Sequence, residues 1–358
     1  MAKISACLIA KNEEGRIDKC LASIFDIVDE IIVVDTGSTD KTKEIAELYG
    51  AKVFDFEWIN DFSAARNLSF SKVTGDWIIW LDCDDVFAPG DIIKFKALKR
   101  TLDTTDTIIF DFWYNYRHDA EGKCTYKFQR DRLIKNLKDF HWEYPVHEAL
   151  LVSGKMTETD ICVTHTSNDD NGEKYITFFK DKIKNEGYIL KQRDMYYYGG
   201  ELAIFGHTDE SQAIFEQFFA MGEHNNQYEA KRAAEYLFNI YLGKEMYLQA
   251  LETEFKYLKY GYPDPKIFYK LGSTFAKLNK IEESIFYYKT AITMRNEFPK
   301  ETCVVNEYAI HVFNCALELV VLLYKRDKVE AKEYHDLCKK LDPTNSSVIF
   351  NERFFEIK

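Results

Sequence analysis

The chain has 358 residues, of which 46% are hydrophobic and 30% are charged. This composition is typical of a globular protein long enough for two domains of about 100–200 residues each. The formal net charge of -12 argues against nonspecific nucleic-acid binding, because phosphates favour basic surfaces, but it leaves room for a local basic pocket that binds one small anion.

Cysteine usage and hydropathy indicate the compartment. The eight cysteines are scattered without a C-x-x-C pair, so we expect reduced thiols and neither a disulfide framework nor a zinc site. The N-terminus becomes charged too early for a secretory signal. No stretch reaches the roughly 18 uninterrupted apolar residues of a membrane span. We therefore expect a cytoplasmic protein.

Short β-like runs alternate with helical stretches up to about residue 165. Strands are predicted at 4–10, 30–35, 51–56 and 76–82, and helices at 16–28, 38–50 and 61–73. This order predicts a parallel sheet covered by helices. Strand-like runs at 107–117, 127–134 and 160–166 follow without long helices between them, which favours an antiparallel or mixed extension.

Helical periodicity replaces the strand pattern after about residue 172, and an internal repeat appears. Aligning the small residues Ala213, Ala250, Ser284 and Ala331 gives intervals of 37, 34 and 47 residues. The copy around Gly272 matches the tetratricopeptide pattern best. We predict an α/β domain at 1–170 and a tetratricopeptide-like helical domain at 171–358, divided near the polar segment "SNDDNGEK".

Polar residues follow three of the predicted parallel strands, after Ala10, at Asp35 and at Asp82. Their sequences are "KNEE", "TGSTD" and "CDD". The carboxyl ends of parallel strands lie on one edge of a sheet, where ligands bind. Neighbouring carboxylates at the mouth of a hydrophobic core require water, a cation or a positively charged partner.

Four ordered segments carry a family resemblance: "SACLIAKNEEGRIDKCLASI", "DEIIVVDTGSTDKT", "DFSAARNLSFSKVTGDWIIWLDCDD" and "HWEYPVHEAL". They resemble the family 2 glycosyltransferases of the Rossmann-like GT-A fold. Within that family, the branch with a tetratricopeptide tail, which includes the sublancin-type peptide S-glycosyltransferases, is the most similar. The resemblance is strong over the first 165 residues and extends to the tail in architecture.

The resemblance implies a UDP-sugar donor, UDP-glucose or UDP-N-acetylglucosamine. Asp35 would accept a hydrogen bond from the uracil ring, and Arg66 would reach the base or the phosphates, whereas Asn67 would orient a loop. The remaining donor-binding positions implied by the motifs are Ala10, Asn12, Glu13, Asp82, Cys83 and Asp84.

A divalent cation, Mg²⁺ or Mn²⁺, is implied by the Asp82-Cys83-Asp84 motif. Such a cation neutralises a diphosphate and acts as a Lewis acid, and it prefers hard oxygen ligands. Asp84 is the expected direct ligand, and Asp82 would face the ribose or a metal-bound water. Asp85 would support the site or be solvated. His165 is the expected further ligand, with His147 as the alternative.

An inverting transferase needs a base that takes the proton of the acceptor. Glu148 is the first candidate, and Glu143 and His147 are alternatives. Trp142 and Tyr144 are candidates for stacking on a sugar or for the core, and base rates favour the core.

The sequence thus predicts a metal-dependent inverting glycosyltransferase acting on Cys, Ser or Thr of a peptide or protein, with bacteriocin-type peptides favoured. The tail would bind this acceptor or form a homodimer. One alternative is a transferase for surface polysaccharide or glycolipid, which would favour a membrane anchor or a basic amphipathic helix. Another is a non-catalytic repeat scaffold, for which "DTGSTD", "AARN" and "DCDD" would be eroded, whereas all are intact.

Overall fold

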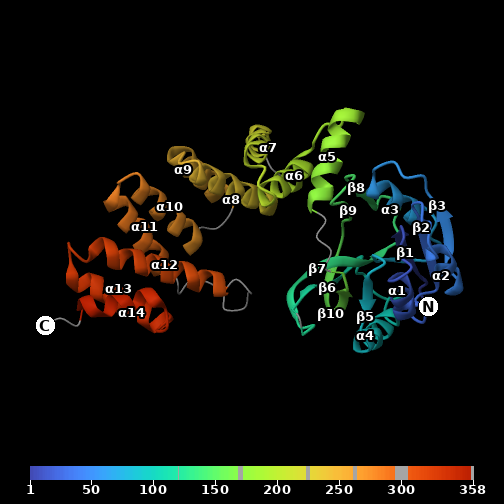
Figure 1. Cartoon of the computed structure of the whole chain (residues 1–358). Helices are drawn as coiled ribbons and strands as arrows, with labels where there is room; N and C mark the ends of the chain where they lie inside the picture. Colours follow the sequence, from blue (N-terminus) through green and yellow to red (C-terminus); the bar gives the residue numbers. More distant parts are fainter. Residues whose placement is uncertain (120, 168–171, 223–225, 261–263, 295–304, 356–358) are drawn as a thin grey trace. The chain divides into compact units, whose positions relative to one another are not determined.

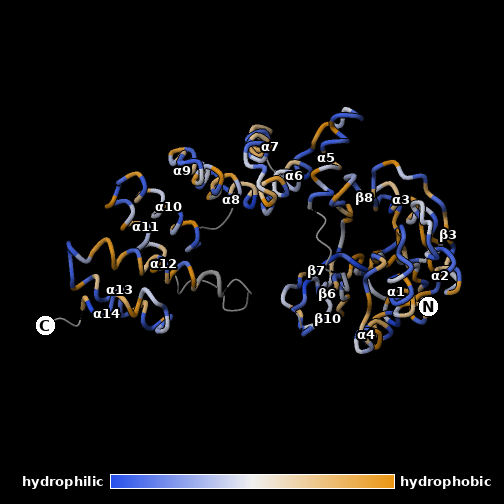
Figure 2. The backbone as a smooth tube through the Cα atoms, viewed as in Figure 1, coloured by the Kyte–Doolittle hydropathy of each residue, from blue (hydrophilic) through white to orange (hydrophobic). Residues whose placement is uncertain are grey.

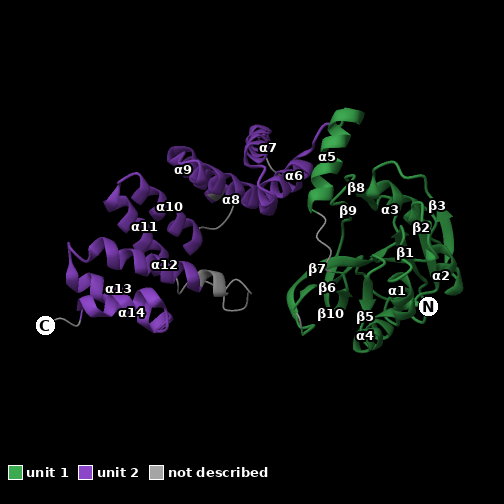
Figure 3. Cartoon of the chain, viewed as in Figure 1, with its two compact units in different colours: residues 1–188 green, residues 189–358 purple. Residues whose placement is uncertain are grey.

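The computed structural model describes the whole chain except residues 120, 168–171, 223–225, 261–263, 295–304 and 356–358. The chain divides into two compact units, Met1–Tyr188 and Ile189–Lys358 (Figure 3). The predicted boundary at 170/171 lies outside the described residues. Among the described helices, none combines the length and apolarity that a bilayer crossing requires.

The first unit is built from strands and helices that alternate along the chain (Figure 1). Its elements are β1 (Ile4–Ala10), α1 (Ile17–Ile24), β2 (Glu30–Asp35), α2 (Thr42–Leu48), β3 (Lys52–Asp55), α3 (Phe62–Ser71), β4 (Trp77–Trp80), β5 (Asp85–Phe87), α4 (Pro89–Lys99), β6 (Ile109–His118), β7 (Cys124–Lys135), β8 (His141–Glu143), β9 (Ala149–Leu151), β10 (Met156–His165) and α5 (Gly172–Glu186).

One mixed sheet organises this unit, in the order β3-β2-β1-β4-β7-β6-β10-β5. Strands β3, β2, β1 and β4 are parallel, as predicted. Strand β7 is antiparallel to both β4 and β6, and β10 is parallel to β6. The predicted mixed extension is therefore confirmed. This mixed α/β sheet agrees with the fold class that the sequence predicted, and β8 and β9 form a separate antiparallel pair.

Hydrophobic side chains cover both faces of the sheet. One cluster contains Leu8 and Val33 of the central strands together with Phe95 of α4. The other contains Ile78 and Trp80 of β4. Burial on two faces explains why β1 and β2 are almost uninterrupted apolar runs and could be predicted within their observed bounds.

The regular elements described in the second unit are all helices (Figure 1). Its helices are α6 (Gln192–Ile204), α7 (Thr208–Ala220), α8 (Gln227–Gly243), α9 (Tyr247–Tyr260), α10 (Pro265–Lys277), α11 (Ile281–Thr293), α12 (Val305–Leu323), α13 (Lys328–Leu341) and α14 (Ser346–Phe355). Hydrophobic and hydrophilic stretches alternate along these helices (Figure 2), as expected for helices that pack along one side.

Two helix pairs of this unit share a close contact at a glycine. A Cβ atom on Gly272 of α10 would lie 2.6 Å from the ring of Tyr288 in α11, and one on Gly199 of α6 would lie 2.9 Å from Phe215 in α7. Both glycines precede their ring by 16 residues (288−272 and 215−199). This shared spacing supports the predicted tetratricopeptide-like repeat.

The same spacing corrects the repeat alignment. Ser284 follows Gly272 by 12 residues (284−272), and the residue 12 after Gly199 (211−199) is Ser211. Both serines are completely buried, whereas Ala213 is exposed. The first repeat is therefore aligned on Ser211, and the choice of Ala213 was wrong by two positions.

Candidate active site

The ends of several strands meet at one edge of the sheet. Strands β1, β2, β4, β6 and β10 all run in the same direction, so their carboxyl ends lie on the same edge. The polar loops after β1, β2 and β4 and the end of β10 therefore converge there. Asp84 and His165 become neighbours because β5, which directly follows Asp84, pairs antiparallel with β10 and places Asp85 opposite His165.

The loops after β1 and β2 are tied to each other. The carbonyl oxygen of Ala10 accepts a hydrogen bond from Thr36 N at 2.9 Å. Asn12, at a positive φ of 55°, accepts one from Thr39 N through Oδ1 at 2.8 Å. Glu13 N donates to the Oγ1 atom of Thr42 at 2.7 Å. The predicted donor-binding residues at the end of β1 and in the loop after it thus hold the two loops together.

Asp35 is buried at the end of β2, with 1% of its surface exposed. Its Oδ1 atom accepts hydrogen bonds from Gly37 N at 3.0 Å and Ser38 N at 2.8 Å. Its Oδ2 atom is buried without a hydrogen-bond partner in the described part of the chain. A buried acceptor in this state is suited to a donor group of a ligand.

Arg66 of α3 connects two predicted site residues. Its Nη2 atom donates to Asp82 Oδ1 at 2.7 Å, and its Nε atom donates to Glu148 Oε1 at 2.7 Å. Burial opposes ionisation of Asp82, but the charges of Arg66, Arg132 and Arg130 outweigh it and lower the pKa of this carboxyl. Arg66 therefore pairs with protein carboxylates in this structure.

The middle residue of the D-x-D motif faces inward. Cys83 is buried, and its Sγ atom lies 3.3 Å from the carbonyl oxygen of Ile9. Burial raises the pKa of the Cys83 thiol well above its ordinary value. Cys83 thus anchors the motif on β1.

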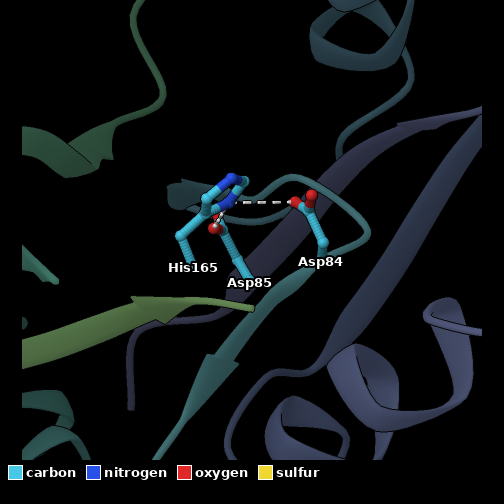
Figure 4. A group of neighbouring side chains, drawn as sticks. All are labelled: Asp84, Asp85 and His165. Carbon is cyan, nitrogen blue, oxygen red and sulfur yellow. Dashed lines mark ion pairs between the residues drawn. The ribbon is translucent and has the colours of Figure 1, made fainter. Parts of the chain in front are cut away.

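Asp84, Asp85 and His165 form a compact group whose ligand atoms lie within 4.8 Å of one another (Figure 4). His165 Nδ1 lies 3.3 Å from Asp84 Oδ1 and 3.6 Å from Asp85 Oδ1. Burial lowers the pKa of the His165 imidazole, but hydrogen bonds with Asp84 and Asp85 outweigh this effect and raise it to about 9. The carboxylates are the hard oxygen ligands that Mg²⁺ and Mn²⁺ prefer, and the imidazole adds one nitrogen ligand.

Asp85 is completely buried, and both of its carboxylate oxygens are engaged. Oδ1 accepts a hydrogen bond from the Tyr114 hydroxyl at 2.8 Å. Oδ2 accepts one from Asp82 N at 3.1 Å and lies 3.0 Å from Arg132 Nη2. From the sequence, Asp85 was expected either to support the site or to be solvated. Because its side chain is completely buried, the structure excludes solvation.

Arg132 and Tyr114 were missed as site residues. Arg132 is completely buried, lies 4.0 Å from the ring centroid of Trp80 and donates to the Trp80 carbonyl at 3.0 Å. The signal that could have indicated it is a charged residue within the strand "KFQRDRLI". Its partner could not be identified without the strand pairing.

The segment after β8 places the candidate bases. Glu148 meets Arg66, as described above, whereas the ring of His147 lies 4.5 Å from that of Tyr175 on α5. Asn67 exchanges two hydrogen bonds with the backbone of Trp142, at 2.8 and 2.7 Å, and so holds strand β8 against α3. Trp142 is buried and packs edge-on against Trp80 with centroids 4.7 Å apart, so it belongs to the core.

Comparisons with known proteins find similarity to glycosyltransferases over the first unit. Residues 5–149 match the model of the family described as glycosyl transferase family 2. A TPR repeat-containing protein of Synechococcus elongatus is 38% identical over 149 residues, which cover 41% of this chain and 35% of that protein. The SPbeta prophage-derived glycosyltransferase SunS of Bacillus subtilis is 31% identical over 149 residues, which cover 40% of this chain and 34% of SunS.

The matched region thus spans about a third of the length of these two relatives. Among solved structures, glucosyl-3-phosphoglycerate synthase from Mycobacterium tuberculosis, in complex with Mn²⁺, uridine diphosphate and glucosyl-3-phosphoglycerate, is similar at 27% identity. The aligned part covers 33% of this chain and 45% of that one, with a TM-score of 0.27.

Proposed function

Because residues 5–149 form a family 2 glycosyltransferase domain, we propose that the protein transfers a sugar from a UDP-linked donor to a Cys, Ser or Thr side chain of a peptide or protein. The observation that carries the proposal is the convergence of Asp84, Asp85 and His165 at the carboxyl edge of the sheet. The reaction is proposed to require a divalent cation and to invert the anomeric carbon.

Asp35 is proposed to bind the base of the donor. Its buried Oδ2 atom lacks a hydrogen-bond partner among the described residues, while backbone amides fix the other oxygen. The imide N–H of a uracil ring would satisfy this acceptor, which supports a uridine nucleotide. The loops held by Asn12 and Glu13 would shape the surrounding wall.

Asp84 and His165 are proposed to hold the cation, because Asp84 offers a carboxylate and His165 an imidazole at the rim of the site. Both side chains are partly accessible, at 17% and 18% of their surface. Asp85 has both oxygens engaged within the protein, so we assign it to positioning Tyr114 and Arg132. When bound, the cation would neutralise the diphosphate and act as a Lewis acid.

Glu148 is proposed as the base that receives the acceptor proton. As the acceptor sulfur or oxygen bonds to the anomeric carbon, the bond from that carbon to the phosphate oxygen breaks. UDP leaves with the electron pair, and the proton passes to the Glu148 carboxylate. The hydrogen bond from Arg66 Nε to Glu148 Oε1 fixes the orientation of this carboxylate.

A polypeptide acceptor is supported by the similarity to SunS and by the helix pairs of the second unit, since tetratricopeptide-like arrays bind peptides. We propose bacteriocin-type peptides as the first class to test, with UDP-glucose and UDP-N-acetylglucosamine as donors. The second unit is proposed to bind the acceptor or to form a homodimer.

The cation site is tested by Asp84→Ala, with Asp181→Ala, an exposed carboxylate of α5, as the matched control. We expect the unfolding midpoint of the wild type and of the control to rise with UDP and Mn²⁺ more than with UDP alone. Asp84→Ala should lose this increment. Equal stabilisation of Asp84→Ala and wild type would contradict the cation site.

Transfer is tested by mass spectrometry of Cys- and Ser-containing peptides incubated with the protein, each UDP-sugar and Mn²⁺. A mass increase of one hexose or N-acetylhexosamine, absent in Asp84→Ala, is the expected result. If UDP stabilises the protein but no peptide gains mass, the peptide acceptor is wrong while the donor site stands.

A further inference from the structure

Three arginines of the first unit lie around the Trp80 ring, and two of them are paired with carboxylates. Arg66 donates to Asp82 and Glu148. Arg132 lies 3.0 Å from Asp85. Both guanidinium charges are thus balanced within the protein.

Arg130 of β7 is the third, and its charge is not balanced in this way. Its guanidinium carbon lies 4.6 Å from the ring centroid of Trp80 and 5.2 Å from that of Tyr114. Within the part of the chain that the structure describes, no hydrogen bond or ion pair joins this guanidinium to another residue. A half-buried cation held between aromatic rings without a hydrogen-bonded carboxylate is costly unless a ligand supplies such a partner.

The position of Arg130 indicates which kind of ligand supplies a partner for its guanidinium. The Arg130 guanidinium lies over the ring of Trp80, the last residue of β4, and Asp82 follows Trp80 by two residues (82−80). Burial and the charge of Arg132 lower the pKa of Arg130, and Asp82 and Asp85 are the carboxylates that oppose this effect. Arg130 therefore lies at the same sheet edge as the candidate cation site.

Tyr114 links the two positions directly. Its ring lies under the Arg130 guanidinium, while its hydroxyl donates to Asp85 and lies 3.0 Å from His165 Nδ1. The ring face of Tyr114 thus contacts Arg130, while its hydroxyl contacts two residues of the proposed cation site. An anion that reaches both must present several oxygens over a short span.

We propose that Arg130 binds an oxygen of the donor diphosphate, an inference that rests on the proposed function. The guanidinium fork matches phosphate oxygens. The chain was expected to use Arg66 for the base or the phosphates, but Arg66 is occupied by Asp82 and Glu148. Arg130 takes the phosphate role, and its charge would add to that of the cation as negative charge develops on the leaving UDP.

The test compares binding of UDP and of uridine to the wild type, Arg130→Gln and Arg130→Lys by calorimetry, in the presence of Mn²⁺. Lys127→Gln is the matched control, because Lys127 lies on the same strand but over Trp113. We expect Arg130→Gln to lose UDP affinity by about tenfold, with uridine affinity unchanged. Arg130→Lys should fall between, because it keeps the charge but not the planar fork.

A phosphate contact must weaken the binding of UDP and leave the binding of uridine unchanged. Unchanged UDP affinity in Arg130→Gln, or an equal loss of affinity for uridine, would therefore overturn the proposal. Thermal unfolding of each variant without ligand establishes that it is folded, and Arg130→Lys serves if Arg130→Gln is not. If neither UDP nor uridine binds the wild type, the proposed function itself fails, which separates the two ideas.

Discussion

Arg66 is the residue on which the candidate site depends for its internal charge balance. It is 9% exposed, lies 4.8 Å from the Trp142 ring centroid and pairs with Asp82 and Glu148. Because both partners are largely shielded from water, removing the guanidinium leaves carboxylates without a counter-charge. The two acids then repel each other in a poorly solvated position.

Arg66→Met should therefore lower the free energy of unfolding by about 3 kcal/mol at pH 7, measured by urea denaturation. Exposed Arg100 at the end of α4 is the matched control, and Arg100→Met should change stability by less than about 0.5 kcal/mol. Comparable effects of the two substitutions would show that the Arg66 pairs contribute little.

The same pair predicts a pH dependence. The pKa of Asp82 in the folded protein is lowered by Arg66 and its neighbours against the effect of burial, so it lies below the unfolded value of about 3.9. The paired carboxylate thus stabilises the fold above this pH and loses that contribution as the pH falls through the folded pKa. The difference in stability between wild type and Arg66→Met should shrink from pH 7 to pH 3. A constant difference would contradict the assignment.

At the scale of elements, the β6–β7 pair contains an acid opposite an acid. Asp111 pairs across the strands with Asp131, and its Oδ1 atom is buried without a hydrogen-bond partner among the described residues. Burial raises the pKa of Asp111 to about 7. A hydrogen bond with Asp131 and the negative charge of Asp131 contribute in the same direction. The folded protein thus holds a proton that the unfolded chain releases near pH 4.

The contribution of Asp111 to stability should consequently decrease as the pH rises from about 4 to 7, because its carboxyl binds fewer protons in the unfolded chain in that window. Asp111→Asn removes the ionisable group. At pH 8 its free energy of unfolding should exceed that of the wild type by about 1 kcal/mol, a gain that solvent screening limits. Near pH 4 the advantage should vanish. Denaturant titrations at both pH values measure this, and an asparagine variant less stable at pH 8 would refute it.

The helix pair α10–α11 depends on the absence of a side chain at Gly272. A Cβ atom there would lie 2.6 Å from the Tyr288 ring, and Tyr288 is buried at 1% exposure. Gly272→Ala should therefore destabilise the second unit by about 2 kcal/mol through overpacking. Gly243→Ala, where no atom lies within 4 Å, should be neutral or stabilising. Differential scanning calorimetry of both variants distinguishes steric crowding from helix propensity.

The elements also show what a sequence can predict. Strands β1 and β2 were predicted within their bounds because they are buried on both faces. Helix α4 was missed, because Pro89 and Gly90 resemble a turn although a proline is well placed in the first turn of a helix. The placement of His165 beside Asp84 was expected from the family resemblance, which implied both residues as cation ligands. The pairing of Arg132 with Asp85 was not predicted, because β7 and β5 are not neighbours in the sheet and no local pattern indicates that the two residues meet.

The whole molecule combines two compact units whose residues carry different tasks in the proposed reaction. Every residue that we assign to the donor, the cation or the acceptor proton lies in Met1–Tyr188. This unit has hydrophobic clusters of its own on both faces of the sheet. The second unit has separate clusters between its helices. Donor chemistry should therefore not require the second unit, whereas recognition of a polypeptide acceptor should.

A chain ending at Tyr188 should bind UDP with Mn²⁺ and hydrolyse a UDP-sugar at a rate similar to that of the full chain, because its donor site is complete. The rate of transfer to a peptide that the full chain modifies should fall by about tenfold or more. A tenfold loss corresponds to the removal of about 1.4 kcal/mol of peptide-binding free energy. Parallel assays of hydrolysis by released UDP and of transfer by mass spectrometry give the ratio. Undiminished transfer by the shortened chain would contradict a peptide-binding role and assign the helical unit to self-association. In that case, analytical ultracentrifugation should show a dimer for the full chain and a monomer for the shortened chain.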